Sequence, residues 1–265
     1  MFNQVTIGQY LPGNSFFHRL EPRIKIGLIS LYVVALFLLR GYWGYSFMTL
    51  FTVLVILSSQ LPLKIILRGL KPLYFILAFT LLLHIFFTKG GTVLFRWGRI
   101  SLESVGLVTG LMMTWRLVLL VMTSSLLTLT TSPIALTDAL ESLLSPFKPL
   151  GVPAHELAMM MTIALRFIPT LLEEAEKIMK AQMARGADFE SGNLLQRAKS
   201  LIPLLVPLFI SSFRRADDLA LAMESRCYRG GKGRTRMKES RIAAKDWLSL
   251  SAFTLSVAVM VWLKI

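Results

Sequence analysis

The longest apolar stretch of the chain reads GLVTGLMMTWRLVLLVMTSSLLTL, from Gly106 to Leu129. A helix needs about 20 mostly apolar residues to cross the hydrocarbon core of a bilayer, and this stretch is long enough. Its one charged residue, Arg116, lies about 15 Å into the stretch at the helical rise, too deep for an easy reach to the membrane surface. The stretch predicts a transmembrane helix that carries an arginine inside the membrane.

Four other apolar blocks predict further spans. They run over Ile26–Leu39, Trp43–Leu57, Pro72–Phe87 and Trp247–Leu263. The first two are short, so flanking Tyr, Trp and Arg residues at the interface would have to complete them, and they suit a tight helical hairpin. With 54% hydrophobic and 17% charged residues, the chain is predicted to be an all-α integral membrane protein with about five transmembrane helices.

The net charge of +14 is explained by membrane orientation better than by nucleic-acid binding, because the basic residues gather in particular loops. With the N-terminus inside, 23 of the 29 Lys and Arg residues lie on the cytoplasmic side and 5 lie outside. This count predicts a cytoplasmic N-terminus and, after five spans, a C-terminus outside. The single cysteine, Cys227, excludes an internal disulfide framework and a cysteine-rich metal site, and we expect neither a metal nor a cofactor.

The segment between Ser132 and Asp246 is polar overall but carries apolar faces at helical spacing. One face runs from Leu157 to Met179 and a second from Leu194 to Met223, which predicts two long amphipathic helices. Both helices are predicted to be too charged overall to span. Because the apolar pattern continues past three prolines, these should kink the helices rather than end them. They are Pro169, Pro203 and Pro207.

Both predicted helices end on similar sequence, AQMARG at 181–186 and AMESRC at 222–227. Gly186 stands where a helix C-cap glycine would. An arginine in a last turn is favoured by the helix dipole, so one such end would mean little. Two similar ends favour a pair of docking points, in which small neighbours let each arginine enter a narrow acidic groove. The alternative is an ordinary helical hairpin packed on itself. The candidate docking residues are Ala184, Arg185, Gly186, Ser225, Arg226 and Cys227.

Five motifs resemble the transmembrane T component of energy-coupling factor (ECF) transporters, which import vitamins and metal ions in prokaryotes. They are GQYLPGNS at 8–15, HRLEPRIK at 18–25, ALRFIPT at 164–170 and, most specific, QMARGADF at 182–189 and MESRCYRG at 223–230. The resemblance covers essentially the whole chain. Cys227 departs from the glycine that the family more often has at this position, and cysteine is small enough to fit there.

The resemblance implies a function shared with partner proteins in the cell membrane. In such transporters the two arginine motifs end crossed cytoplasmic coupling helices and dock on a pair of ABC ATPase subunits, identical or different. This role would fall to Arg185 and Arg226. A separate membrane-embedded substrate-binding (S) subunit would hold the substrate, a micronutrient of the cobalamin, riboflavin or folate type or a metal ion.

The resemblance also implies a division of the chain into three parts. Residues 1–131 would form a membrane domain with four spans, and residues 247–265 would form the last span. Residues 132–246 would form the cytoplasmic coupling domain. A third, shorter coupling helix is expected there between Ser132 and Leu150.

A methionine cluster and the intramembrane arginine are candidate contacts with the S subunit. Met159, Met160 and Met161 would suit a surface that repacks against several partners, because methionine side chains are flexible, although ordinary core filling also explains them. Arg116 is a functional candidate because a charge inside a membrane is costly. The alternative for Arg116 is a structural pairing with a backbone carbonyl or a neighbouring side chain.

Enzyme classes fit the sequence poorly. The zinc pattern H-E-x-x-H starts at 155 but has Met159 at its second histidine, and GGKG at 230–233 has Gly233 where a phosphate-binding loop needs Ser or Thr. The three histidines are expected to be isolated: His18, His84 and His155. We therefore expect no catalysis by this chain, with ATP hydrolysis left to the partner subunits. A conventional ABC permease is the other alternative, and such a permease would bind a solute on its own.

Overall fold

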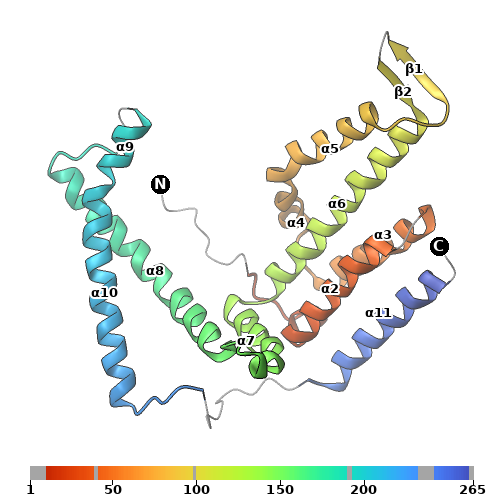
Figure 1. Cartoon of the computed structure of the whole chain (residues 1–265). Coiled ribbons are helices and arrows are strands. Elements are labelled where there is room, and N and C mark those ends of the chain that lie inside the picture. Colours follow the sequence, from red (N-terminus) through yellow and green to blue (C-terminus); the bar gives the residue numbers. More distant parts are fainter. Residues whose placement is uncertain (1–9, 39–40, 98–99, 190–192, 232–241, 263–265) are drawn as a thin grey trace. The chain divides into compact units, whose positions relative to one another are not determined.

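A computed structural model describes residues 10–38, 41–97, 100–189, 193–231 and 242–262. The described chain is mainly helical (Figure 1). It forms two compact units. The bundle unit holds Gly8–Leu136 and Glu239–Ile265, and the hairpin unit holds Thr137–Lys238, which is inserted between them in the sequence. The start of the opening motif, the last two residues of GGKG, and the predicted span ends Leu39 and Leu263 lie outside the described residues.

The bundle unit contains the predicted spans and one small sheet. Its helices are α1 (Phe16–Arg19), α2 (Pro22–Leu38), α3 (Tyr42–Ser59), α4 (Leu63–Leu70), the 3-10 turn Lys71–Leu73, α5 (Tyr74–Phe87), α6 (Ser104–Thr130) and α11 (Ala244–Trp262). Between α5 and α6 the chain forms an antiparallel hairpin of β1 (Val93–Trp97) and β2 (Ile100–Glu103), with Trp97 opposite Ile100. The all-α fold class is confirmed, and this hairpin is a small addition within a predicted loop.

The core of the bundle unit is built from α2, α3, α6 and α11. Its buried members are Tyr32, Ala35, Leu36, Met48, Leu119, Phe253 and Val257. Phe51 and Phe253 lie with ring centroids 4.5 Å apart, and the Tyr32 hydroxyl and Thr52 Oγ1 are 2.6 Å apart in a hydrogen bond. The core therefore joins the N-terminal helices to the last helix of the chain.

Glycines allow α5 and α6 to pack closely. A Cβ atom at Gly106 would lie 2.6 Å from the backbone oxygen of Thr88, and one at Gly110 would lie 3.1 Å from the Cβ of His84. Small residues at such positions let helix backbones approach each other, which is a common basis for helix association in membranes. The apolar stretch that starts at Gly106 thus carries its own packing face.

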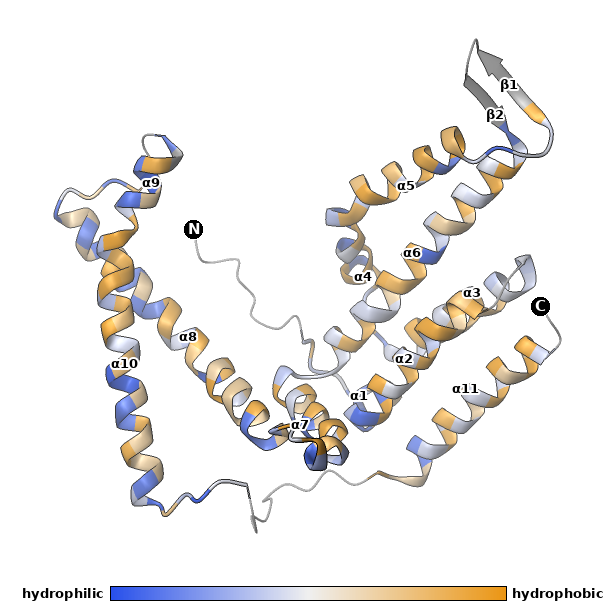
Figure 2. Cartoon of the chain, in the orientation of Figure 1, coloured by the Kyte–Doolittle hydropathy of each residue, from blue (hydrophilic) through white to orange (hydrophobic). Residues whose placement is uncertain are grey.

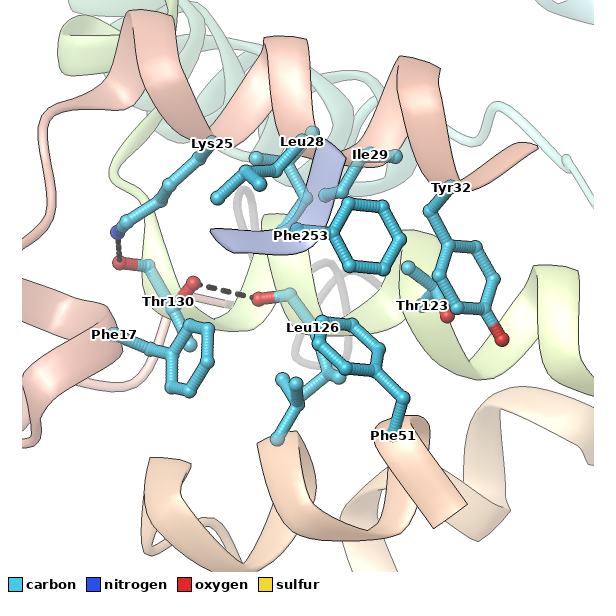
Figure 3. Close-up of a pocket in the computed structure, with 12 residues that line it drawn as sticks. Phe17, Lys25, Leu28, Ile29, Tyr32, Phe51, Thr123, Leu126, Thr130 and Phe253 are labelled. Carbon is cyan, nitrogen blue, oxygen red and sulfur yellow. Dashed lines mark hydrogen bonds between the residues drawn. The ribbon is translucent and has the colours of Figure 1, made fainter. Parts of the chain in front are cut away.

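Lys25 lies inside the bundle unit, at the start of α2. Its side chain donates hydrogen bonds from Nζ to the backbone oxygen of Thr130 (3.0 Å) and to Thr131 Oγ1 (3.2 Å), at the end of α6. Lys25 also lines a small, mainly apolar cavity of about 60 Å³ between α2, α3, α6 and α11 (Figure 3). A cation at a helix C-terminus satisfies carbonyl groups that have no partner within the helix. Lys25 therefore fixes the point at which α6 ends.

Among the described residues, five helical segments are long and apolar enough to cross a membrane. They are Tyr42–Ser59, Leu63–Phe87, Ser104–Thr130, Ala154–Ala184 and Ala244–Trp262. Four of these match predicted spans. The fifth predicted span corresponds to α2, which has 17 residues and is shorter than each of the five segments. The remaining segment, Ala154–Ala184, was expected to be too charged. One 18-residue window within it reaches a mean hydropathy of 1.2, against 1.9 for α6, so part of this helix meets the length and composition of a span, and its placement outside the membrane stays a prediction.

The surface of α5 has the character expected in contact with lipid. No residue of α5 is buried, and Phe75 and Phe87 are each 78% exposed. Figure 2 shows that α5 is hydrophobic along most of its length, whereas the helices of the hairpin unit mix hydrophilic and hydrophobic residues. Such an apolar surface would be unfavourable in water, and a bilayer removes that cost. The chain is a multi-pass membrane protein.

The hairpin unit consists of two long helices and shorter ones. They are α7 (Pro133–Leu144, which begins in the bundle unit), the 3-10 turn Ser145–Leu150, α8 (Ala154–Ala184), α9 (Leu194–Ser200) and α10 (Ile202–Ser225). Pro169 and Pro207 lie inside helices, as predicted. The prediction for Pro203 is wrong: α9 ends at Ser200 and α10 begins at Ile202. A proline in the first turn of a helix loses no hydrogen bond, so a helix that starts at Ile202 accommodates Pro203 at its N-terminus.

Candidate docking site at two helix ends

The two long helices of the hairpin unit lie antiparallel and in contact. Three hydrogen bonds show their pairing: Gln182 Nε2 donates to the backbone oxygen of Pro203 (3.4 Å), Arg215 Nη2 donates to Glu174 Oε2 (2.8 Å), and His155 Nε2 lies 3.2 Å from the Tyr228 hydroxyl. The end of α8 is therefore beside the start of α10, and the end of α10 is beside the start of α8. Since a helix rises about 1.5 Å per residue, Arg185 and Arg226 lie on the order of 40 Å apart, at opposite ends of the hairpin.

The first arginine end, Ala184–Gly186, closes α8 with a Schellman cap. Gly186 has φ of 88°, in the left-handed region, and its N–H donates to the backbone oxygen of Met183 (3.0 Å). The N–H of Ala187 donates to the backbone oxygen of Gln182 (3.0 Å). These two bonds are the pattern that defines the motif, so the predicted C-cap glycine is confirmed.

The second arginine end, Ser225–Cys227, closes α10 in the same way. The N–H of Cys227 donates to the backbone oxygen of Glu224 (2.8 Å), and the N–H of Tyr228 donates to that of Met223 (3.1 Å). Arg226 has φ −90° and ψ 12°, against φ −91° and ψ 8° for Arg185. The two arginines thus leave their helices with nearly identical backbone geometry.

The two caps differ in residue type at the position that follows the arginine. Cys227 has a φ of 56°, in the left-handed region. Gly186 occupies the same region without steric cost, because glycine has no Cβ. A left-handed backbone costs an L-residue roughly 1–2 kcal/mol, so the second arginine end is strained relative to the first. Cysteine therefore fits the cap, at an energetic cost.

All six candidate docking residues are exposed. Neither Arg185 nor Arg226 has a carboxylate of any described residue within ion-pair distance. Each cation lies beside carbonyl groups at a helix C-terminus, which is a favourable position for its charge. Both guanidinium groups are therefore available for an acidic partner, and their planar forks can bind a carboxylate through two hydrogen bonds.

A groove of about 480 Å³ adjoins the second arginine end. It is lined by Met159 and Ile163 of α8, Leu219 and Met223 of α10, and residues 226–230 that follow α10. The methionine cluster is divided: Met159 faces this groove, whereas Met160 is 55% and Met161 is 37% exposed. Met159 therefore lines the groove between α8 and α10, and the exposed side chains of Met160 and Met161 are accessible to a partner.

The three histidines are not isolated, contrary to the expectation, and even His84 has a partner: its Nδ1 lies 2.9 Å from the backbone oxygen of Thr80. His155 lies between Glu141 Oε1 (3.1 Å from Nδ1) and the Tyr228 hydroxyl, and His18 contacts Ser15 and the backbone oxygen of Leu11. The partners of His155 are 14 and 73 positions away in the sequence, so no local pattern could have predicted them. Within the described ranges no three His, Cys, Asp or Glu side chains gather as metal ligands.

Arg116 is held by aromatic rings within the bundle unit. Its guanidinium carbon lies 4.9 Å from the ring centroid of Phe37 and 5.6 Å from that of Tyr45, and Nη1 lies 3.7 Å from the sulfur of Met113. Cation–π contacts gain strength where water is excluded. These neighbours support the structural alternative for Arg116, and its place in the S-subunit contact stays a prediction.

The fold and these two ends define a class: a multi-pass helical membrane protein that carries an antiparallel hairpin with an exposed arginine at each end. The family model described as cobalt transport protein (CbiQ) matches residues 13–237. The chain is 55% identical over 262 residues (99% of this chain, 97% of the relative) to the energy-coupling factor transporter transmembrane protein EcfT of Ruminiclostridium cellulolyticum. It is 59% identical over 250 residues (94% and 93%) to the EcfT protein of Thermosediminibacter oceani, and 47% identical over the full length of both chains to that of Listeria innocua. The chain belongs to the CbiQ/EcfT family of transmembrane components of energy-coupling factor transporters.

Proposed function

We propose that this chain is the coupling subunit of an ECF-type ABC importer. It transmits the ATP-driven motion of two ATPase subunits to a membrane-embedded S subunit that binds the micronutrient. The observation that carries the proposal is the pair of exposed arginines with the same backbone geometry at opposite ends of one helical hairpin. Two equivalent docking points, on the order of 40 Å apart, suit two separate partner subunits better than one.

The transmission step follows from simple mechanics. An ATPase pair that closes on ATP and opens after hydrolysis moves its two docking grooves relative to each other. Arg185 and Arg226, each fixed by charge-assisted hydrogen bonds, carry that motion into α8 and α10. The groove between α8 and α10 is lined by apolar side chains that include Met159 and Met223, whose packing can shift without breaking hydrogen bonds.

The remaining roles are assigned to other parts of the chain and to its partners. Residues 1–131 and 247–265 anchor the subunit in the membrane, with the N-terminus and residues 132–246 in the cytoplasm. Met160 and Met161 are exposed and suit contact with the S subunit. Substrate choice then belongs to the S subunit, and ATP hydrolysis belongs to the ATPases.

The test is co-purification and uptake with the ATPase pair and an S subunit. Arg185→Ala and Arg226→Ala should each weaken assembly or uncouple hydrolysis from uptake, and the double substitution should abolish both. Arg214→Ala is the matched control, because Arg214 is exposed on α10 but lies outside both arginine ends. Normal assembly and transport by the double variant would reject the proposal and leave a packed hairpin with no docking role.

A further inference from the structure

Three side chains form a hydrogen-bonded row beside the second arginine end. Glu141 comes from α7, His155 is the second residue of α8, and Tyr228 follows Arg226 by two positions. Glu141 Oε1 lies 3.1 Å from His155 Nδ1, and His155 Nε2 lies 3.2 Å from the Tyr228 hydroxyl. The side chains of His155 and Glu141 are only 21% and 17% exposed. The row therefore links three segments within the hairpin unit.

The chemistry of the row fixes where its protons lie. A carboxylate only accepts hydrogen bonds, so Nδ1 of His155 must donate to Glu141. In the neutral imidazole, Nε2 is then an acceptor, and the Tyr228 hydroxyl donates to it. In the protonated imidazole, Nε2 donates to the tyrosine oxygen instead. The row is thus satisfied in both charge states of His155.

The backbone of Gly231 packs against the imidazole of His155. A Cβ atom at Gly231 would lie 2.6 Å from Cδ2 and 2.8 Å from Cγ of His155, closer than real Cβ atoms approach. The backbone at Gly231 therefore lies directly against the ring. Gly230 has φ of 83°, a conformation that favours glycine and turns the chain towards this contact. Tyr228 and Gly231 together fasten the segment after α10 to the start of α8.

We propose that Glu141, His155 and Tyr228 form a brace that positions Arg226 for docking. This inference rests on the proposed function. His155 and Tyr228 are positioning residues, because they act through the backbone between Tyr228 and Arg226. The brace restrains the second arginine end, whose cap contains Cys227 in the left-handed region. A force applied to Arg226 is then transmitted to α7 and α8 as well as to α10.

Cys227 is the only cysteine of the chain and is exposed, so it can report on the brace directly. A nitroxide on Cys227, in the full-length chain in lipid nanodiscs, measures local mobility by electron paramagnetic resonance. Tyr228→Phe and His155→Ala should both raise that mobility, whereas Glu141→Gln, which keeps an acceptor oxygen, should stay close to the wild type. Tyr74→Phe, on the exposed surface of α5, is the matched control. Unchanged mobility in both Tyr228→Phe and His155→Ala would overturn the brace.

A double-mutant cycle tests its role in docking. The affinity of the unlabelled chain for the ATPase pair is measured for Tyr228→Phe alone and combined with Arg226→Ala or Arg185→Ala. Loss of one hydrogen bond predicts a decrease of about fivefold for Tyr228→Phe, with no further loss on top of Arg226→Ala and the full loss on top of Arg185→Ala. Equal effects in both combinations would reject positioning in favour of general destabilisation.

Each of the two experiments can contradict its own part of the inference independently of the other. If Arg226→Ala leaves the affinity unchanged, the proposed docking role of Arg226 is wrong, and the role of the brace in docking is wrong with it. The nitroxide result then still decides whether the three side chains hold this end of the helix.

Discussion

The two arginine ends have the same backbone conformation but differ in the residues and contacts that stabilise it. Arg185 and Arg226 differ by a few degrees in φ and ψ, and each follows the last turn of a long helix. The first end reaches this geometry with glycine at no steric cost, whereas the second does so with Cys227 in a strained conformation. The second end is also joined to α7 and α8 through Tyr228 and His155. The comparison teaches that cap hydrogen bonds can impose one geometry on two sequences, while the side-chain contacts around the two ends differ.

The largest effect is expected from reversing either charge. Arg185→Glu or Arg226→Glu should lower the affinity for the ATPase pair by at least about 100-fold, because a charge-assisted hydrogen bond worth roughly 1.5–3 kcal/mol is replaced by repulsion. Arg→Lys at either position should cost about tenfold, since lysine keeps the charge but loses the planar fork. Binding of the purified ATPases to the chain in nanodiscs measures both. A reversal tolerated at one end only would show that just one end docks.

The next effect concerns the glycine of the first arginine end. Gly186→Ala should destabilise the cap by about 1–2 kcal/mol, because alanine in the left-handed region is strained. The added Cβ would meet nothing within 4 Å, so the backbone conformation is the whole cause. Hydrogen exchange at the amides of Gly186 and Ala187 should become roughly tenfold faster. Ala184→Ser, two residues earlier, should leave the exchange rate nearly unchanged, and equal protection in all three chains would show that the cap does not depend on glycine.

The reverse change should make the second arginine end resemble the first. Cys227→Gly relieves about 1 kcal/mol of strain, so exchange of the Cys227 and Tyr228 amides should slow by about fivefold. Cys227→Ala removes the thiol and keeps the strain, so it should behave like the wild type. If both variants change exchange alike, the thiol rather than the backbone is what distinguishes this position.

The smallest effect is expected midway along the hairpin. Arg215 and Glu174 form an ion pair with side chains 30% and 23% exposed, and Arg215 also lies 5.9 Å from the ring centroid of Phe167. Glu174→Gln should cost no more than about 1 kcal/mol in stability, because partly solvated pairs are screened. The loss should raise hydrogen exchange at both arginine ends equally. A selective effect on one end would mean that the ends are coupled through this pair.

The sequence alone determined the features that depend on local pattern. Apolar runs predicted four of the five candidate spans, since the hydrocarbon thickness sets a length that can be read without tertiary structure. Helical spacing predicted α8, and Gly186 predicted its cap, because a Schellman motif is made by residues next to one another. The paired arginine motifs also lie within short stretches, and the family resemblance built on them is confirmed.

Tertiary structure decided everything that depends on distant partners. It placed Lys25 against the end of α6, set Arg116 between Phe37 and Tyr45, and joined His155 to residues 14 and 73 positions away. It also decided that Pro203 starts a helix, which a continuous apolar pattern had concealed. Most of all, it separated the two arginine ends by antiparallel packing of α8 and α10. Sequence spacing cannot supply this arrangement, because it depends on side-chain contacts between segments that meet only in the folded chain.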